Sequence, residues 1–219
     1  MHDRTLSYLR GRFGDHYRRT TIDPPPAANR REWGYVVWTA SGGETYVRHN
    51  SLLDLGAIKE FLPRERPRHV YFSAGRYDDP GATRMDAKGW RSADLIFDLD
   101  ADHLPGTDGD DSYAEMLAAC KDALERLLDF LETDFAFEEL SIVFSGSRGY
   151  HVHVRDEGVQ SLDSDARREI VDYVRGAGFG LDAHVREETV AGSAGRTSPA
   201  RGPGRRYTWP SASIAACVR

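Results

Sequence analysis

Cysteine is scarce in this sequence, and its scarcity argues against several classes of protein. The two cysteines, Cys120 and Cys217, lie far apart in a chain of 219 residues. They cannot form a Cys-x-x-Cys half-site, which argues against a disulfide framework and against a structural zinc site built from thiolates. Cys120 lies at helical spacing among leucines, so we expect it to be a small buried hydrophobic residue.

Long apolar runs are also missing. No segment approaches the roughly 20 apolar residues that a membrane-spanning helix needs. The first residues, MHDRTLSYLRGRFG, lack the apolar core of a secretory signal. We therefore expect a cytoplasmic protein that has no membrane partner.

Lysine is nearly absent, and positive charge does not dominate. Lys59, Lys88 and Lys121 are the only lysines, and the formal net charge is −6. This balance argues against non-specific binding of nucleic acid over the whole surface, although it is compatible with a local basic groove. An acidic, lysine-poor composition fits either a salt-rich cytoplasm or a GC-rich genome.

The order of expected elements predicts an α+β fold. Helical periodicity marks residues 1–20, a segment from 52 to a stop at Pro63, a segment from a Ser112 capping box to Leu131, and a last helix from Asp163 or Ser164 to about Gly176. Runs of β-forming residues predict strands at 34–39, 44–48, 69–73, 95–100, 140–145 and 151–155, with a turn at 41–43 and a polar loop at 75–89. We expect a mixed or antiparallel sheet with helices over one face.

The end of the chain has a different character. From about residue 190 onwards the sequence contains small residues, arginine and proline without a sustained period. We therefore expect one domain over residues 1–190 and a disordered or aberrant tail over residues 191–219.

The clearest chemical signal is the acidic pair Asp98 and Asp100 at the end of an apolar strand. Residues two apart on a strand point to the same face, with Cα atoms roughly 6–7 Å apart. Two carboxylates held this close repel each other unless a cation lies between them, and Mg²⁺ prefers such oxygen ligands. The alternative is a solvent-facing acidic strand end. Asp102 is a weaker ligand candidate, or a group that supports the ligands.

A second signal is the segment Ser145-Gly146-Ser147-Arg148-Gly149, followed by His151 and His153. A glycine-flanked turn after a strand can direct backbone N–H groups at an anion, and arginine can bind phosphate oxygens with two hydrogen bonds. His151 and His153 lie on one face of the next strand. Without the preceding turn they would indicate only a half-exposed polar face.

Taken together, these motifs resemble the small subunit of the archaeo-eukaryotic primases, and of the archaeal type in particular. The resemblance extends over roughly residues 5–195. It rests on Val70–Tyr77, Met85–Trp90, Ile96–His103 and Val143–Val154, with an upstream segment in Arg31-Glu32-Trp33 and Val47–Ser51 that resembles the family's nucleotide site.

The resemblance implies a role for each matching residue. Asp98 and Asp100 correspond to ligands of catalytic Mg²⁺ or Mn²⁺; Ser145, Arg148 and His151 to residues around the triphosphate of the incoming nucleotide; and Arg48 to an upstream nucleotide-site residue. The implied enzyme is a DNA primase, a nucleotidyltransferase that joins nucleoside triphosphates into short RNA primers on a single-stranded DNA template. It works with a large subunit as a heterodimer. We expect the two motifs to lie on adjacent strands of the sheet. We also expect Arg48 and these motif residues to line one shallow, open cleft.

Three departures from the family pattern affect these expectations. Ser147 stands where many relatives have a second arginine. After the first motif only His103 and Cys120 could replace the family's zinc ligands, so no structural zinc is expected. Nothing after Gly178 matches the third motif, for which Asp182 is the possible substitute ligand, so we expect a truncated or frameshifted chain with impaired polymerase activity.

Other functions remain open at this point. Phe97-Asp98-Leu99-Asp100 also resembles the nucleophile strand of haloacid-dehalogenase-like phosphatases, although Asp102 stands where that family has threonine. A non-enzymatic alternative is an inactive fragment that binds a nucleotide or a partner. Within the primase superfamily, a repair or translesion role is compatible with the same motifs.

Overall fold

The computed structural model describes residues 2–40, 43–104 and 111–177, and the backbone of 214–216. The chain forms two compact units. The first contains the residues up to Leu95 together with Arg155–Leu162, and the second contains Ile96–Val154 and residues from Asp163 onwards. The mixture of helices with antiparallel strands confirms the α+β class. The expected boundary at residue 190 lies outside the described residues.

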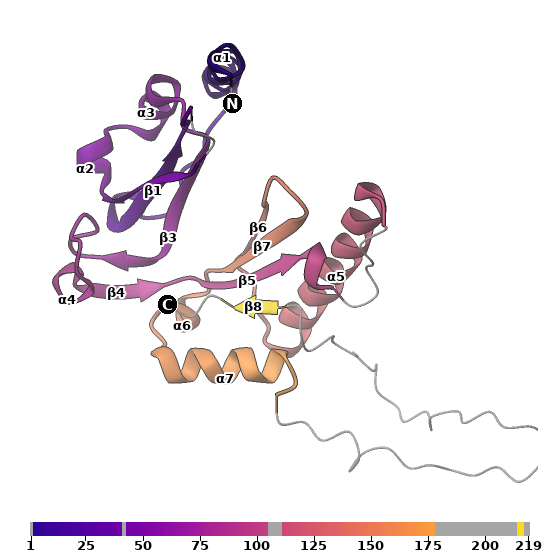
Figure 1. Cartoon of the computed structure of the whole chain (residues 1–219). Coiled ribbons are helices and arrows are strands. Elements are labelled where there is room, and N and C mark those ends of the chain that lie inside the picture. The colour runs from indigo at the N-terminus through magenta and orange to yellow at the C-terminus, as the bar shows by residue number, and fades with distance from the viewer. Residues whose placement is uncertain (1, 41–42, 105–110, 178–213, 217–219) are drawn as a thin grey trace, which may run out of the picture. The chain divides into compact units, whose positions relative to one another are not determined.

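The first unit is a four-stranded antiparallel sheet with helices packed against it (Figure 1). Its elements are α1 (Asp3–Arg19), η1 (Ala28–Arg30), β1 (Arg31–Val37), β2 (Thr45–Asn50), α2 (Leu52–Leu55), α3 (Ile58–Glu65), β3 (His69–Tyr77), α4 (Met85–Lys88), β4 (Trp90–Ala93) and α6 (Glu157–Gln160). The strand order is β2-β1-β3-β4.

The core of the first unit forms between β1 and the helices α2 and α3. Trp33 of β1 packs with four buried side chains: Leu55, Ile58, Phe61 and Leu62. These residues are buried because the strand alternates and the helices are amphipathic, so each element turns its apolar side inward. The expected hairpin is confirmed by the pairing of β1 with β2, although positions 41 and 42 of its turn lie outside the described residues.

Two expectations for this unit are wrong. The helix expected from residue 52 to Pro63 is broken at Gly56, where φ is 80°, and Pro63 lies inside α3 instead of ending it. Burial of Phe61 and Leu62 holds the helix through the proline, and Arg66, with a left-handed φ of 53°, ends it.

The polar loop expected over residues 75–89 is the second error. β3 continues to Tyr77 because it pairs there with β4, a strand that the sequence pattern did not reveal. Lys88 at the end of α4 is buried, and its Nζ donates to the Pro80 carbonyl at 2.7 Å and pairs with Glu32 at 3.1 Å. This partner is remote in sequence, so local composition could not reveal it.

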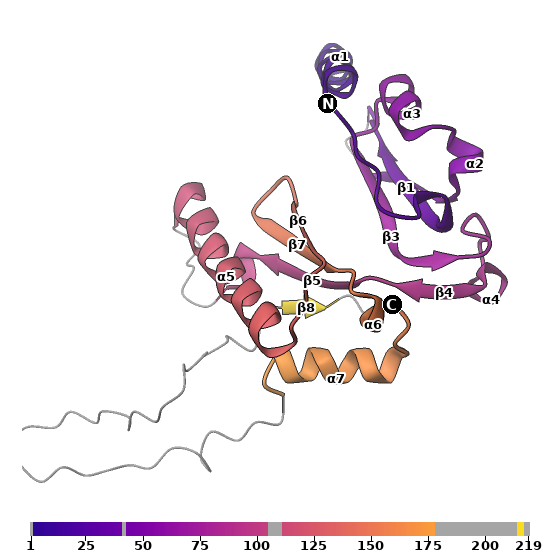
Figure 2. The same cartoon turned by 180° about the vertical axis from the view of Figure 1, so that it is seen from behind.

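The second unit contains the two chemical motifs. Its elements are β5 (Leu95–Asp100), η2 (Ala101–His103), α5 (Tyr113–Asp134), β6 (Leu140–Phe144), β7 (Gly149–Val154), α7 (Ser164–Val174) and β8 (Ile214–Ala216). The strand order is β6-β7-β5-β8, so the expectation that the motifs lie on adjacent strands is confirmed. Figure 2 shows the same strands from behind.

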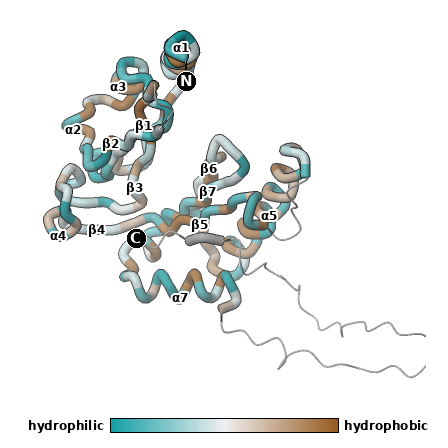
Figure 3. The backbone as a smooth tube through the Cα atoms, viewed as in Figure 1, coloured by the Kyte–Doolittle hydropathy of each residue, from teal (hydrophilic) through white to brown (hydrophobic). Residues whose placement is uncertain are grey.

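The apolar residues of β5 and α5 form the interior of this unit. Leu95, Phe97 and Leu99 are buried on alternate positions of β5, and the leucine stripe of α5 is buried with them. Figure 3 shows hydrophobic and hydrophilic residues alternating along α5. Cys120 is fully buried in this helix, as expected. The Ser112 capping box and the Asp163 cap of α7 are also confirmed.

Candidate functional site

The acidic strand end of β5 forms one wall of a small pocket. Because Leu99 points into the core, Asp98 and Asp100 point to the opposite face of the sheet. The pocket has a volume of about 140 Å³ and is lined by Asp98, Leu99, Asp100, Ser145, Ser147, Arg148, Gly149 and His151. All five motif residues that the sequence singled out in this unit therefore lie around one pocket.

The turn between β6 and β7 is held by its own backbone and by a serine. Ser145 N donates to the Gly149 carbonyl at 2.9 Å, and Gly149 N donates to Ser145 Oγ at 3.1 Å. Gly146 has a φ of 84°, a conformation that glycine adopts without strain. Tyr113 at the start of α5 donates to the Ser147 carbonyl at 2.8 Å. Sequence reasoning missed this support from Tyr113, which no local motif indicates.

His151 and Arg148 of the pocket each have an ion-pair partner. His151 Nε2 lies 3.3 Å from Asp98 Oδ1, and Arg148 pairs with Asp102. Asp100 Oδ1 accepts a hydrogen bond from Asp102 N at 3.1 Å. Asp102 thus supports Arg148. The side chains of Asp98, Arg148 and His151 are each between 40 and 47% exposed, so a ligand can reach them from solvent.

The two carboxylates also affect the residue beneath them. The Cys120 Sγ lies 4.0 Å from the Leu99 carbonyl oxygen. Burial raises the pKa of the Cys120 thiol, and the negative charges of Asp100 and Asp98 raise it further. A buried thiol whose pKa is raised suits a packing role.

The donor set of the pocket fits a hard divalent cation that also binds a substrate. Within the described ranges no group of three or more His, Cys, Asp or Glu side chains could hold a metal ion. Mg²⁺ commonly binds to proteins through one or two carboxylates, and water and substrate phosphates complete its coordination. Asp98 and Asp100 provide such a pair. Asp182, the possible third ligand, lies outside the described residues.

Arg48 lies in the first unit, where it lines a groove of its own. Its guanidinium lies 5.4 Å from the ring centroid of Tyr46. The groove has a volume of about 470 Å³ and is lined by Glu32, Gly34, Tyr35, Tyr46, Val47, Arg48, Tyr71, Phe72 and Ser73. Of the segment Arg31-Glu32-Trp33, only Glu32 lines this groove, because Arg31 and Trp33 are buried.

Gly149 allows β7 to approach β5 closely, and we expect the Gly149→Ala variant to disrupt the pocket. A Cβ at this position would collide with the carbonyl oxygen of Leu99. Backbone atoms cannot move aside as a flexible side chain can, so we expect about 1–3 kcal/mol of destabilisation, as for overpacked cores. Denaturation of the variant, followed by circular dichroism, measures this loss. Gly158→Ala, where nothing lies within 4 Å, is the control, and equal stability of the two variants would contradict the close approach.

Comparison with known proteins adds independent evidence. Residues 97–196 match the family model described as DNA primase small subunit. The chain is 69% identical over 202 residues to the DNA primase small subunit PriS of Haloarcula marismortui. The aligned region covers 92% of this chain and 52% of that protein.

Relatives of lower identity have the same name. PriS of Natronomonas pharaonis is 61% identical over 223 residues, covering 100% of this chain and 56% of the relative. PriS of Methanothrix thermoacetophila is 43% identical over 209 residues, covering 93% of this chain and 52% of the relative. The chain spans about half the length of these curated relatives.

No helix among the described residues is long and apolar enough to cross a membrane.

Proposed function

Because the chain belongs to the family of DNA primase small subunits, we propose that it acts in the catalytic subunit of a primase. The proposed reaction joins nucleoside triphosphates into short RNA primers on a single-stranded DNA template. The 3′-hydroxyl of one nucleotide attacks the α-phosphate of the next, and pyrophosphate leaves. The observation that supports this reaction best is the pocket in which two carboxylates face an arginine and a histidine.

Asp98 and Asp100 are the residues that would hold Mg²⁺ or Mn²⁺. A bound divalent cation would supply charge neutralisation at the phosphates and favour ionisation of the attacking hydroxyl. His151 lies beside Asp98, whereas Arg148 of the same pocket pairs with Asp102, so the described cations neutralise the two carboxylates only in part. The shared orientation of the carboxylates and their exposure support this assignment.

Arg148, His151 and Ser145 would bind the triphosphate. Arg148 has five N–H donors, and the pairing with Asp102 uses the Nη2 end, so other donors can bind phosphate oxygens. The side chain of Asp102 therefore keeps Arg148 beside the pocket without saturating it. Arg48 is proposed as a further nucleotide-binding residue, in the groove of the first unit. We further propose that a large subunit binds the whole protein as its partner.

A direct assay tests this function. The full chain is incubated with a single-stranded DNA template and ribonucleotides in the presence of Mg²⁺ or Mn²⁺, and the products are separated by length. We expect products complementary to the template that disappear completely when the metal is removed with EDTA. Ca²⁺ added in place of Mg²⁺ controls for an effect of charge on folding alone.

The other outcomes favour other functions. Metal-dependent nucleotide binding without any product would favour the alternative, a non-catalytic nucleotide-binding fragment. The phosphatase alternative, which the family match does not support, would require phosphate release from a phosphomonoester. The absence of both primer synthesis and nucleotide binding would contradict the proposal.

A further inference from the structure

A buried ion cluster lies in the first unit, near the points where the chain leaves this unit and returns to it. The chain leaves the first unit between Leu95 and Ile96 and re-enters it between Val154 and Arg155. Asp94 and Arg155, which flank these two points, pair with each other: Arg155 Nε lies 3.3 Å from Asp94 Oδ2. Asp94 is fully buried, and Arg155 is 15% exposed.

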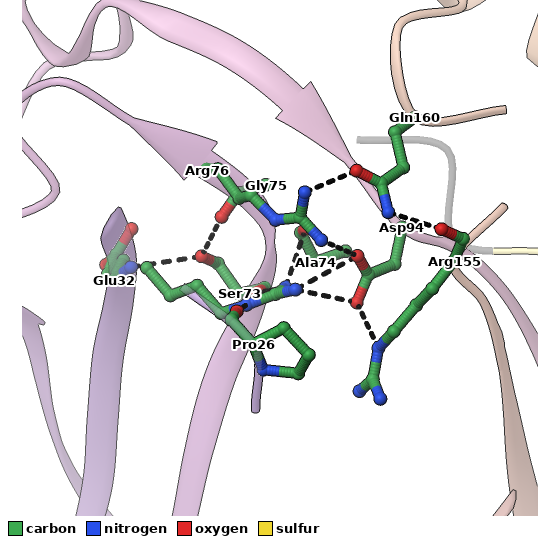
Figure 4. A network of polar contacts seen from close by, with 10 residues as sticks. Pro26, Glu32, Ser73, Ala74, Gly75, Arg76, Asp94, Arg155 and Gln160 are labelled. Carbon is green, nitrogen blue, oxygen red and sulfur yellow. Dashed lines mark hydrogen bonds and ion pairs between the residues drawn. The ribbon is translucent and has the colours of Figure 1, made fainter. Parts of the chain in front are cut away.

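Two further arginines bind the same carboxylate. Arg31 Nη2 donates to Asp94 Oδ1 at 3.0 Å and to Oδ2 at 2.9 Å, and Arg76 Nη2 donates to Oδ1 at 3.1 Å. Arg76 also donates to Gln160, which donates in turn to the Arg155 carbonyl oxygen (Figure 4). The segment that returns from β7 is therefore held through both Arg155 and Gln160.

Arg31 anchors this cluster to the sheet of the first unit. It is fully buried, and all five of its N–H groups have acceptors. Two of these acceptors are the carboxylate oxygens of Asp94. The other three are the carbonyl oxygens of Pro26, Ser73 and Ala74, at 2.8–3.0 Å. The three carbonyl oxygens hold the guanidinium in place, and the guanidinium in turn holds both carboxylate oxygens of Asp94. A lysine, which has three donors from one nitrogen, could not do this.

Contacts recur at regular intervals along the two segments that contain β5 and β7. Ala101, just after β5, donates its N–H to the carbonyl oxygen of Arg148, just before β7, at 3.3 Å. Three residues back along β5 and three onward along β7, Asp98 contacts His151. Four residues further along each segment, just beyond the ends of the two strands, Asp94 contacts Arg155. The equal spacing of the three contacts along the two segments is that of an antiparallel arrangement.

From this geometry we infer that Asp94 and Arg155 are positioning residues that fix the register of β5 against β7. The inference rests on the proposed function in so far as that register places Asp98 and Asp100 beside Ser145, Arg148 and His151. A slip of one residue would turn every side chain of one strand to the other face, so a lock at one end of the pair preserves the pocket. Neither positioning residue lines the pocket itself.

The test uses Arg155→Gln, which removes the charge, and Arg155→Lys, which keeps it. Arg168→Gln, at an arginine that is 66% exposed on α7, is the matched control. Hydrogen exchange is measured in the full chain over β5 and β7, together with kcat and KM for primer extension. In Arg155→Gln we expect exchange about tenfold faster at Ala101 and along β7, because a hydrogen bond to a charged group is lost.

The expected kinetic effect is a loss in kcat. Misplacing reacting groups by about 1 Å can cost about 100-fold in rate, so we expect kcat to fall about 10- to 100-fold. The nucleotide KM should change less than about threefold, because Arg155 does not line the pocket. Arg155→Lys should restore most of both properties.

The exchange measurement separates this inference from the proposed function. Faster exchange in Arg155→Gln, reversed in Arg155→Lys, supports the positioning role even if no form of the chain extends a primer. Exchange in Arg155→Gln equal to that in Arg168→Gln overturns it, whatever the activity. A loss of kcat without faster exchange in β5 and β7 also overturns it.

Discussion

Replacing Asp98 with asparagine is expected to lower the rate of primer extension by about 100- to 10,000-fold. Asparagine has nearly the same shape but no charge, so it weakens the cation site and leaves the fold in place. A bound divalent cation contributes several kcal/mol to a phosphoryl transfer, and each 1.36 kcal/mol is about tenfold in rate. Single-nucleotide extension of a labelled primer at saturating Mg²⁺ measures the change.

A matched substitution separates the cation site from general charge. Asp122 is exposed on α5 and lines neither pocket, so Asp122→Asn removes the same charge from the same unit. We expect its rate to stay within about twofold of the unmodified chain, as for surface substitutions generally. A rate for Asp98→Asn equal to that of Asp122→Asn would remove Asp98 from the proposed site.

Replacing Asp94 with asparagine is expected to lower the free energy of unfolding by about 3–5 kcal/mol, as for other buried ion pairs that lose one partner. The carboxylate accepts hydrogen bonds from Arg31, Arg76 and Arg155. Asparagine would leave three guanidinium groups without their shared anion and would direct an N–H₂ group at their donors. Denaturant unfolding followed by circular dichroism measures the loss.

Asp86→Asn is the control for this prediction. Asp86 is 66% exposed and pairs with Arg84 on the surface, where an ion pair contributes about 0–1 kcal/mol. A loss for Asp94→Asn no larger than that for Asp86→Asn would show that the buried cluster is not a strong stabilising element. The same result would weaken the case for Arg31 as its anchor.

The pocket of the second unit was accessible to sequence reasoning because short-range patterns determine it. The alternation in Leu95–Asp100 separates the core face from the acidic face, and the glycines around Arg148 mark a turn. Both patterns operate within a few residues, and the structure places them as expected. The prediction that these two strands are neighbours came from the family resemblance and not from either pattern.

The buried cluster was not accessible in the same way. Arg31 belongs to a segment that resembles a nucleotide site, and an arginine side chain is rarely fully buried. Both facts favour a position of Arg31 at the surface. Its partner Asp94 is 63 positions away. Local periodicity contains no information about such a pair. The strand β4 was missed for a related reason, since its four residues show no alternation long enough to recognise.

The ion pair between Asp94 and Arg155 has a consequence for how the protein is made. The two residues are 61 positions apart, and closing a flexible loop of that length costs roughly 4 kcal/mol of chain entropy in addition to a constant term. Pairing of β5 with β7 shortens this loop, so it lowers the entropic cost of forming the ion pair.

Synthesis on the ribosome also delays the formation of this ion pair. At about 5–20 residues per second, Leu162 emerges about 3–13 s after Leu95. Throughout that interval the nascent first unit has Arg31, Arg76 and Asp94 but lacks Arg155 and Gln160. It therefore becomes complete only after the strands that contain both motifs have been made.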